Sequence, residues 1–200
     1  MIRKAAFVAA ALFCAGCASA STEPAGEPSA GEQAAMQDAW TKYATPGEAH
    51  AKLAKQCGEW EISSKMWMAP GAPPMESRGH ATLRMVLGGR YQAQEFHGDF
   101  GGMPYEAMGT TGYDNQRRAY LGTWIDNMGT GLMTMEGAET APGVFTYTGE
   151  MVDPAGGGME RFRSVMTEQG PDTILFEMFG TEHGSAGMRK MMEMVYTRQR

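Results

Sequence analysis

Two carboxylates occupy positions where acid–base chemistry is conceivable. Asp114 and Asp126 each precede an asparagine and each end a run of strand-like residues. General acid–base catalysis needs a second group nearby and a perturbed pKa, and the sequence specifies neither. Both residues equally suit turns, where an Asp side chain accepts hydrogen bonds from local backbone donors. Gly-x-Ser-x-Gly, His-Glu-x-x-His and phosphate-binding glycine motifs are absent. The sequence therefore identifies no catalytic residue and favours a protein that is not an enzyme.

Methionine is unusually frequent, with 19 among 200 residues. Thioethers bind Cu(I), so same-face methionines on strands are conceivable metal ligands. Three pairs have that spacing: Met66 and Met68, Met133 and Met135, and Met192 and Met194. The methionines are nevertheless spread along the chain without His or Cys beside them, which favours their use as flexible core packing. We predict neither a metal site nor a cofactor.

The first twenty residues resemble a bacterial export signal. Arg3 and Lys4 precede a short apolar stretch that is too brief to span a membrane. The run Cys14-Ala15-Gly16-Cys17 resembles a lipobox with Cys17 as the lipidated residue, whereas Ala18-Ser19-Ala20 fits ordinary signal peptidase. We expect an exported protein of the cell envelope, lipid-anchored through Cys17. A soluble periplasmic or secreted protein is the alternative.

The rest of the chain divides into a tether and one domain. Residues 21–44 begin with a tract rich in Ser, Pro, Gly, Glu and Ala, which predicts a flexible tether, and residues 45–200 are long enough for one domain with its own core. Residues 1–20 carry two of the 17 basic residues and none of the 23 acidic ones, so their removal changes the net charge from −6 to −8. An acidic surface argues against nucleic acid as a partner. Any contact with a membrane is expected through the lipid anchor alone.

A short helix is predicted at the start of the domain. Thr45 and Glu48 can form a capping box, with Pro46 at the first helical position. The helix should end near Cys57, because Gly58 follows. Its apolar stripe would cover one open end of a barrel.

From Trp60 onward the sequence alternates strand-like runs with turn residues, which predicts an all-β fold. Short connections make neighbouring strands antiparallel, and so long a sheet must curl to avoid exposed edges. We expect an up-and-down β-barrel of about ten strands, with a two-sheet sandwich as the alternative. The predicted strands are 60–68, 76–86, 91–99, 105–114, 119–126, 132–137, 145–152, 159–168, 173–180 and 190–198.

Alternation along the strands then predicts which side chains face the inside of the barrel. We expect the turn after residue 168 to reverse the face. Carrying the alternation past the glycine-rich turn at 153–158 would then expose Phe145 and Tyr147, so we expect a bulge there. The side chains predicted to point inward are Trp60, Ile62, Met66, Met68, Arg163, Val165, Ile174, Phe176, Met178, Met192, Met194, Tyr196 and Arg198.

Several phrases of the sequence resemble known families. Gly58-Glu59-Trp60 with Arg198 resembles the signature of the calycins, in which a cation lies on the indole and closes the barrel. The runs 69–74, 112–115, 123–131 and 190–198 resemble the bacterial domain of unknown function 1579. The resemblance covers residues 46–198 and implies a calycin-like barrel, often exported, without an established activity. Some ten-stranded calycins hold haem through one histidine, but alternation predicts that His80 and His97 point outward.

These observations favour a binding protein. About ten strands should leave a cavity, and we expect it to hold a small, mostly apolar molecule. The predicted contacts are Tyr113, Trp124, Met194 and Tyr196, with Arg163 orienting the ligand. Two alternatives remain open: an enzyme of unknown class at the barrel mouth, and an envelope protein that docks or forms a homodimer. The apolar patch for docking would comprise Trp67, Leu175, Phe179 and Met191.

Overall fold

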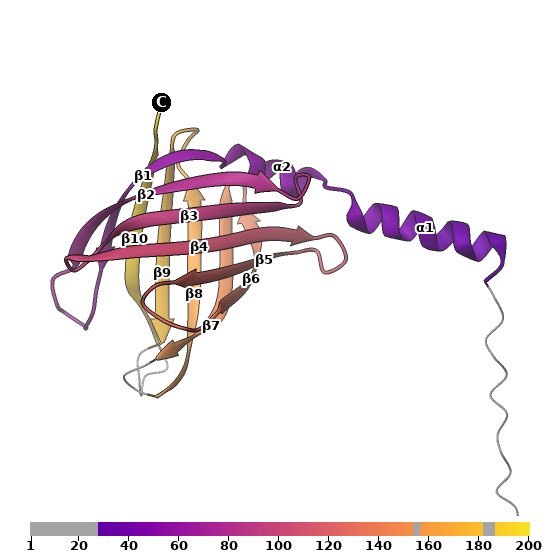
Figure 1. Cartoon of the computed structure of the whole chain (residues 1–200). Coiled ribbons are helices and arrows are strands. Elements are labelled where there is room, and N and C mark those ends of the chain that lie inside the picture. Colours follow the sequence, from indigo (N-terminus) through magenta and orange to yellow (C-terminus); the bar gives the residue numbers. More distant parts are fainter. Residues whose placement is uncertain (1–27, 154–156, 182–186) are drawn as a thin grey trace, which may run out of the picture.

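The computed structural model describes residues 28–153, 157–181 and 187–200, which form two helices and a ten-stranded antiparallel barrel (Figure 1). Each strand pairs with its neighbours in sequence, and β1 pairs with β10, so the sheet closes on itself. This confirms the barrel and excludes the sandwich. The elements are α1 (Ala30–Ala44), α2 (Glu48–Lys55), β1 (Gly58–Met66), β2 (Met75–Val86), β3 (Tyr91–Phe100), β4 (Met103–Asp114), β5 (Ala119–Asp126), β6 (Met133–Ala141), β7 (Val144–Asp153), β8 (Gly158–Glu168), β9 (Thr173–Thr181) and β10 (Met188–Arg198).

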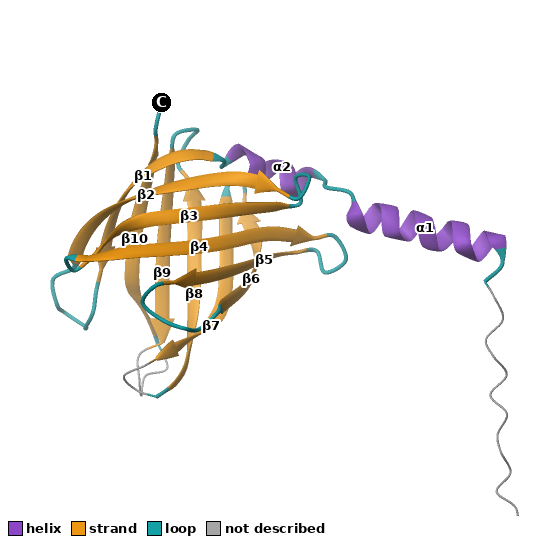
Figure 2. Cartoon of the chain, in the orientation of Figure 1, coloured by secondary structure: helices purple, strands orange, loops and turns teal. Residues whose placement is uncertain are grey.

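The two ends of the barrel differ. At one end, α2 lies beside the short turns that join β2 to β3, β4 to β5, β6 to β7 and β8 to β9 (Figure 2). The opposite end, which we call the rim, holds the last residues of β1, β3, β5, β7 and β9 and the first residues of β2, β4, β6, β8 and β10. Among the described residues, a helix covers the barrel at the α2 end and none covers the rim.

Helix α2 begins later than the sequence predicted. Its N-cap is Gly47, whose backbone N–H donates to Nδ1 of His50 at 3.0 Å. The predicted capping box of Thr45 with Glu48 is wrong, because the Thr45 hydroxyl donates to the carbonyl of Thr41 at 2.6 Å and so belongs to the end of α1. The predicted apolar stripe is present, since Leu53 is 1% exposed against the barrel.

Residues 30–44 form helix α1 where the sequence predicted part of a flexible tether. A capping box joins Ser29 to Glu32, and none of the helical residues is buried. Figure 1 shows α1 standing away from the barrel. None of the helices in the described ranges is long and apolar enough to cross a membrane. Residues 1–27, which include Cys17, lie outside the described part of the chain.

The predicted inward faces of the first and last strands are confirmed. Trp60 pairs with Arg198, Ile62 with Tyr196 and Met66 with Met192, and Trp60 and Ile62 are buried. On β9, Ile174 and Met178 are buried on the same face. Met68 departs from the prediction, because β1 ends at Met66 and Met68 is 64% exposed in the following loop.

The inward face of β8 is the opposite of the one predicted. Ser164 lies opposite Met178, and Phe162 and Ser164 are buried. Arg163 and Val165 therefore point outward, and Arg163 is exposed. The error lies at the turn 169–172, which keeps the face instead of reversing it.

The aromatic residues of β7 face the interior without a bulge on that strand. Phe145 pairs with Met166 and Tyr147 with Ser164, and both aromatic side chains are buried inside the barrel. A bulge does occur on β10, between Lys190 and Met192.

Arg198 closes the barrel over Trp60. The guanidinium carbon lies 4.2 Å from the centroid of the indole, which is the predicted cation–π contact. The guanidinium also donates hydrogen bonds to the carbonyls of Cys57 at 2.6 Å, Lys55 at 2.9 Å and Pro171 at 3.1 Å. One side chain thus joins the last strand to the first strand, to the end of α2 and to the turn before β9.

Replacing Arg198 should destabilise the barrel strongly. Arg198→Ala removes the cation–π contact and three hydrogen bonds to carbonyls, one of them part-buried, so we expect a loss of about 2–4 kcal/mol in the free energy of unfolding. Urea denaturation followed by tryptophan fluorescence measures this loss. Arg200→Ala is the control, because Arg200 is exposed and its ion pair with Asp172 is worth less than about 1 kcal/mol. Equal effects of the two substitutions would contradict the closing role of Arg198.

Candidate functional site

The end of the barrel beside α2 is filled with side chains. Leu53 of α2 packs against Tyr120, Phe145 and Tyr147, all of them buried. Burial raises the pKa of the Tyr120 phenol to about 12. Gln92 donates to the carbonyl of Leu53 at 2.7 Å, which fastens the helix to β3. This part of the interior is packed core.

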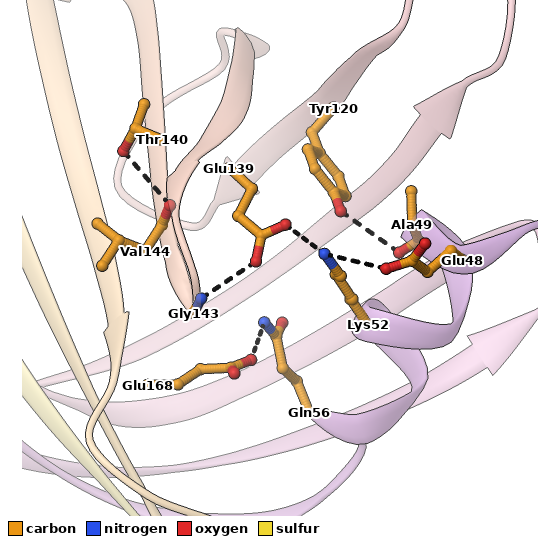
Figure 3. Close-up of polar contacts among 10 residues, drawn as sticks. All are labelled: Glu48, Ala49, Lys52, Gln56, Tyr120, Glu139, Thr140, Gly143, Val144 and Glu168. Atoms are coloured by element: carbon orange, nitrogen blue, oxygen red, sulfur yellow. Dashed lines mark hydrogen bonds and ion pairs between the residues drawn. The ribbon is translucent and has the colours of Figure 1, made fainter.

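Polar contacts fix α2 to the barrel (Figure 3). Lys52 forms an ion pair with Glu139, whose carboxylate also accepts from the backbone N–H of Gly143 at 3.1 Å. The hydrogen bond from Lys52 holds the pKa of Glu139 below its usual value. Gln56 donates to Glu168 at 2.9 Å. The charged groups at this end therefore hold the helix in place.

Tyr113 belongs to this packed end. Its ring makes edge contacts with Tyr120, at a centroid distance of 4.9 Å, and with His50 at 6.0 Å. The sequence predicted Tyr113 as a ligand contact together with Trp124, Met194 and Tyr196. The structure places it in the cluster under α2 and leaves the other three in a separate cluster.

Trp124, Met194 and Tyr196 meet in the middle of the barrel. They pack with Tyr105 and Met166 against a buried cluster that includes Trp60, Ile62 and Phe96. All five face the interior by register, yet each stays partly accessible to solvent. Burial raises the pKa of the Tyr105 and Tyr196 phenols. A side chain that is deeply enclosed yet accessible borders internal space, which we call the lumen.

The indole of Trp124 lies against the barrel wall. Gly109 is directly opposite it on β4, and a Cβ atom at Gly109 would lie 2.7 Å from the indole ring. Only glycine lets the ring lie this flat over the neighbouring strand. The pairing places an aromatic surface beside the lumen without filling it.

A short chain of hydrogen bonds runs from Trp124 toward the rim. The indole N–H donates to the Tyr105 hydroxyl at 3.1 Å, and this hydroxyl donates to Asp126 at 3.1 Å. Deeper in the lumen, Gln94 donates to the Tyr196 hydroxyl at 3.3 Å. The sequence reading missed Tyr105 and Gln94, although counting the register outward from Trp124 across the turn before β5 would have placed Tyr105 on the inward face.

Arg163 cannot orient a ligand in the lumen. It lies on the outer surface, where its guanidinium carbon is 4.7 Å from the centroid of the Phe179 ring. Phe179 was predicted to belong to an apolar docking patch, and this contact covers it. Met191, another member of that patch, lies in the β10 bulge and packs where a side chain on Gly180 would lie.

The two predicted carboxylates are at opposite ends of the barrel. Asp114 caps the turn after β4, accepting from the backbone N–H groups of Gln116 at 2.8 Å and Arg117 at 2.9 Å. Asp126 pairs with Ala107 of β4. Ala107 is seven residues from Asp114 on the same strand, so the two carboxylates are separated by roughly 23 Å at the usual rise per residue. They cannot act as an acid–base pair.

The structure offers no metal site built from acidic, His or Cys residues within the described ranges. His80 and His97 pair across β2 and β3 on the outer face, as predicted, and His80 contacts Glu59 at 2.9 Å. Neither can reach a group held in the lumen. His183 lies outside the described residues.

Two pockets lie away from Trp124, Met194 and Tyr196. One, of about 680 Å³, is beside α2 and is lined by Gln56, Trp60, Glu168, Asp172 and Arg198 among others. Its arginine already binds three carbonyls. The other, of about 290 Å³, is bordered by residues of β1, β2 and β10, mostly from the outer face. The polar residues that line these two pockets either hold α2 in place or face solvent. The lumen is therefore the better candidate site.

The rim carries several exposed hydrophobic side chains. They lie on the described strand ends and connections, and those on β7, β8 and β10 point to the outer face by register. These residues are Met68, Met103, Met128, Leu132, Val152, Met159 and Met188. Exposed apolar groups gathered at an opening are typical of a binding site.

The closed antiparallel barrel, with a helix at one end and an arginine on the first-strand tryptophan, defines a calycin-like barrel protein. The chain belongs to the protein family of unknown function DUF1579, which matches residues 45–198. Both predictions from the sequence are confirmed.

Two solved structures share this fold. The crystal structure of Rv2717c from M. tuberculosis has 13% sequence identity and a TM-score of 0.54, covering 78% of this chain and 100% of its own. The S-type phycobiliprotein lyase CPES from Guillardia theta has 8% identity and a TM-score of 0.56, covering 80% of this chain and 97% of its own. A comparison with curated proteins finds no match. At these identities the likeness concerns the fold alone.

Proposed function

We propose that the protein binds a small, mostly apolar molecule in the lumen. The observation that carries this proposal is the partial accessibility of Tyr105, Trp124, Met194 and Tyr196, which face the interior of a closed barrel. Barrels of more than eight strands have room for a ligand beyond their own side chains. Aromatic rings and thioethers supply apolar contact area, and the hydroxyl and amide groups of Tyr196 and Gln94 can orient a polar atom.

The ligand would pass through the rim. The opposite end is filled by α2 and its packed cluster, whereas the rim carries exposed methionines. Methionine side chains are flexible and adapt to apolar molecules of different shapes. The predicted docking or homodimer role has less support, because Arg163 covers Phe179 and Met191 packs in the bulge.

Filling the lumen should weaken binding. Met194→Trp adds bulk inside the barrel, so we expect the affinity for the uncharged probe N-phenyl-1-naphthylamine to fall about tenfold or more. The probe's fluorescence in a titration measures the affinity. Thr197→Trp is the matched control, because Thr197 is exposed on the outer face of the same strand.

Urea denaturation must show that both variants remain folded. The proposal fails if the wild-type protein binds the probe without saturation, or if Met194→Trp binds it as tightly as Thr197→Trp does.

We also propose that the barrel works in the cell envelope, held by a lipid on Cys17. The support is the sequence of residues 1–20, with its charged start, short apolar stretch and lipobox-like run. Mass spectrometry of the mature protein should find a chain that begins at a lipidated Cys17. A mature chain that begins at Ser21 would contradict the anchor, and one that begins at Met1 would contradict export.

A further inference from the structure

We infer that the ligand of the lumen is a cationic amphiphile, with its apolar part inside the barrel and its positive head group at the rim beside Asp126. This inference rests on the proposed function and adds the charge of the ligand to it. It follows from where the charged side chains of the barrel lie relative to the lumen.

The middle of the lumen holds no charged side chain among the described residues. Inward positions there are occupied by aromatic, aliphatic and methionine side chains and by neutral polar groups such as Ser64, Ser77 and Gln94. The charges Glu139, Glu168 and Arg198 face inward only at the end beside α2, where each is already paired. Burying an unpaired ligand charge in such surroundings is costly. A charged head group would therefore remain at the rim.

Asp126 is the charged group placed to meet it. It is the last residue of β5 and lies opposite Ala107, which is buried on the inward face. The Trp124 indole and the Tyr105 phenol lie next to it. A carboxylate at the edge of an aromatic-lined lumen can pair with an ammonium group through charge-assisted hydrogen bonds.

The carboxylate of Asp126 retains capacity for a ligand. Its Oδ1 accepts from the backbone N–H of Met128 at 2.9 Å, and its Oδ2 accepts from the Tyr105 hydroxyl at 3.1 Å. A carboxylate offers about four acceptor positions, so about two remain. The two existing bonds hold the group in one orientation.

A second carboxylate, Glu160, adds negative charge to the same end. It lies opposite Met151 on the inward face of β8. The basic side chain that register places inward near the rim is Arg189, opposite Gly180. Its guanidinium donates to the carbonyls of Trp67 at 2.9 Å and Met68 at 3.5 Å, which directs it to the backbone of the rim. A fatty acid would meet acidic groups where it needs a free cation.

The net charge of the chain acts in the same direction. At −6, it produces a long-range field that attracts cations and repels anions. Arg163, the cation that the sequence predicted would orient the ligand, lies on the outer surface.

A head-group series tests the inference. Decylammonium, decanol and decanoate share one apolar chain and differ in charge at pH 7, and each can displace N-phenyl-1-naphthylamine from the protein. We expect decylammonium to bind about five- to tenfold more tightly than decanol, and decanoate to bind most weakly. The preference for decylammonium should shrink in high salt, because the rim is exposed to solvent.

Asp126→Asn removes the charge and keeps one side-chain oxygen, which can accept from the backbone N–H of Met128, while its NH2 group can donate to the Tyr105 hydroxyl. We expect it to lose most of the preference for decylammonium over decanol. Glu106→Gln is the matched control. This substitution also removes one negative charge, but from the outer face of β4 near the same end of the barrel. If Asp126→Asn disturbs decanol binding, Glu160→Gln repeats the test with the second carboxylate.

The outcomes separate this inference from the proposed function. If decanoate binds as tightly as decylammonium, or if Glu106→Gln reduces the preference as much as Asp126→Asn, the lumen still binds apolar molecules but the cationic class is wrong. If none of the three compounds displaces the probe, the lumen is not a binding site and both proposals fall.

Discussion

The contact between Arg198 and Trp60 organises the rest of the molecule. A guanidinium on the indole brings the last strand to the first, and its three hydrogen bonds bring the end of α2 and the turn before β9 to the same point. Carbonyls at the C-terminal end of a helix carry partial negative charge, which favours a cation there. The closure thus depends on one side chain whose donors are already occupied, so this arginine is not available to a ligand.

This closure makes the two ends of the barrel chemically different. Beside α2, the interior is filled by Leu53 and aromatic residues, and ion pairs fasten the helix. At the rim, exposed methionines lie on strand ends and connections, and Tyr105 and Trp124 face the interior near that end. Between the ends, inward side chains stay partly accessible, because rings such as that of Trp124 lie flat over glycine. A stable closed end leaves the other end free to admit a ligand.

Much of the fold could be predicted from the sequence because its signals are local. Two-residue alternation and turn residues located all ten strands, and the Gly-x-Trp and arginine pattern located the closure. Helix α1 was missed although Ser29 and Glu32 have the spacing of a capping box. The surrounding composition, rich in small and polar residues, had favoured a flexible tether instead.

The site was harder to predict because it depends on register across turns. One wrong assumption at residues 169–172 placed Arg163 inside the barrel and exposed Phe145. Tyr113 shares the inward face of β4 with Tyr105, but Tyr113 lies at the other end of that strand, under α2. Alternation specifies which face a residue occupies. Depth along the barrel depends on how neighbouring strands are staggered, and only the structure shows this.

The most direct test of the central claim is to locate a bound ligand in a crystal. A crystal grown with 10-bromodecan-1-ol would show the bromine by its anomalous scattering. The account predicts one strong bromine peak inside the barrel, among Trp124, Met166 and Met194. A bromine in the pocket beside α2, or an interior filled by side chains with bromine only on the outer surface, would contradict it.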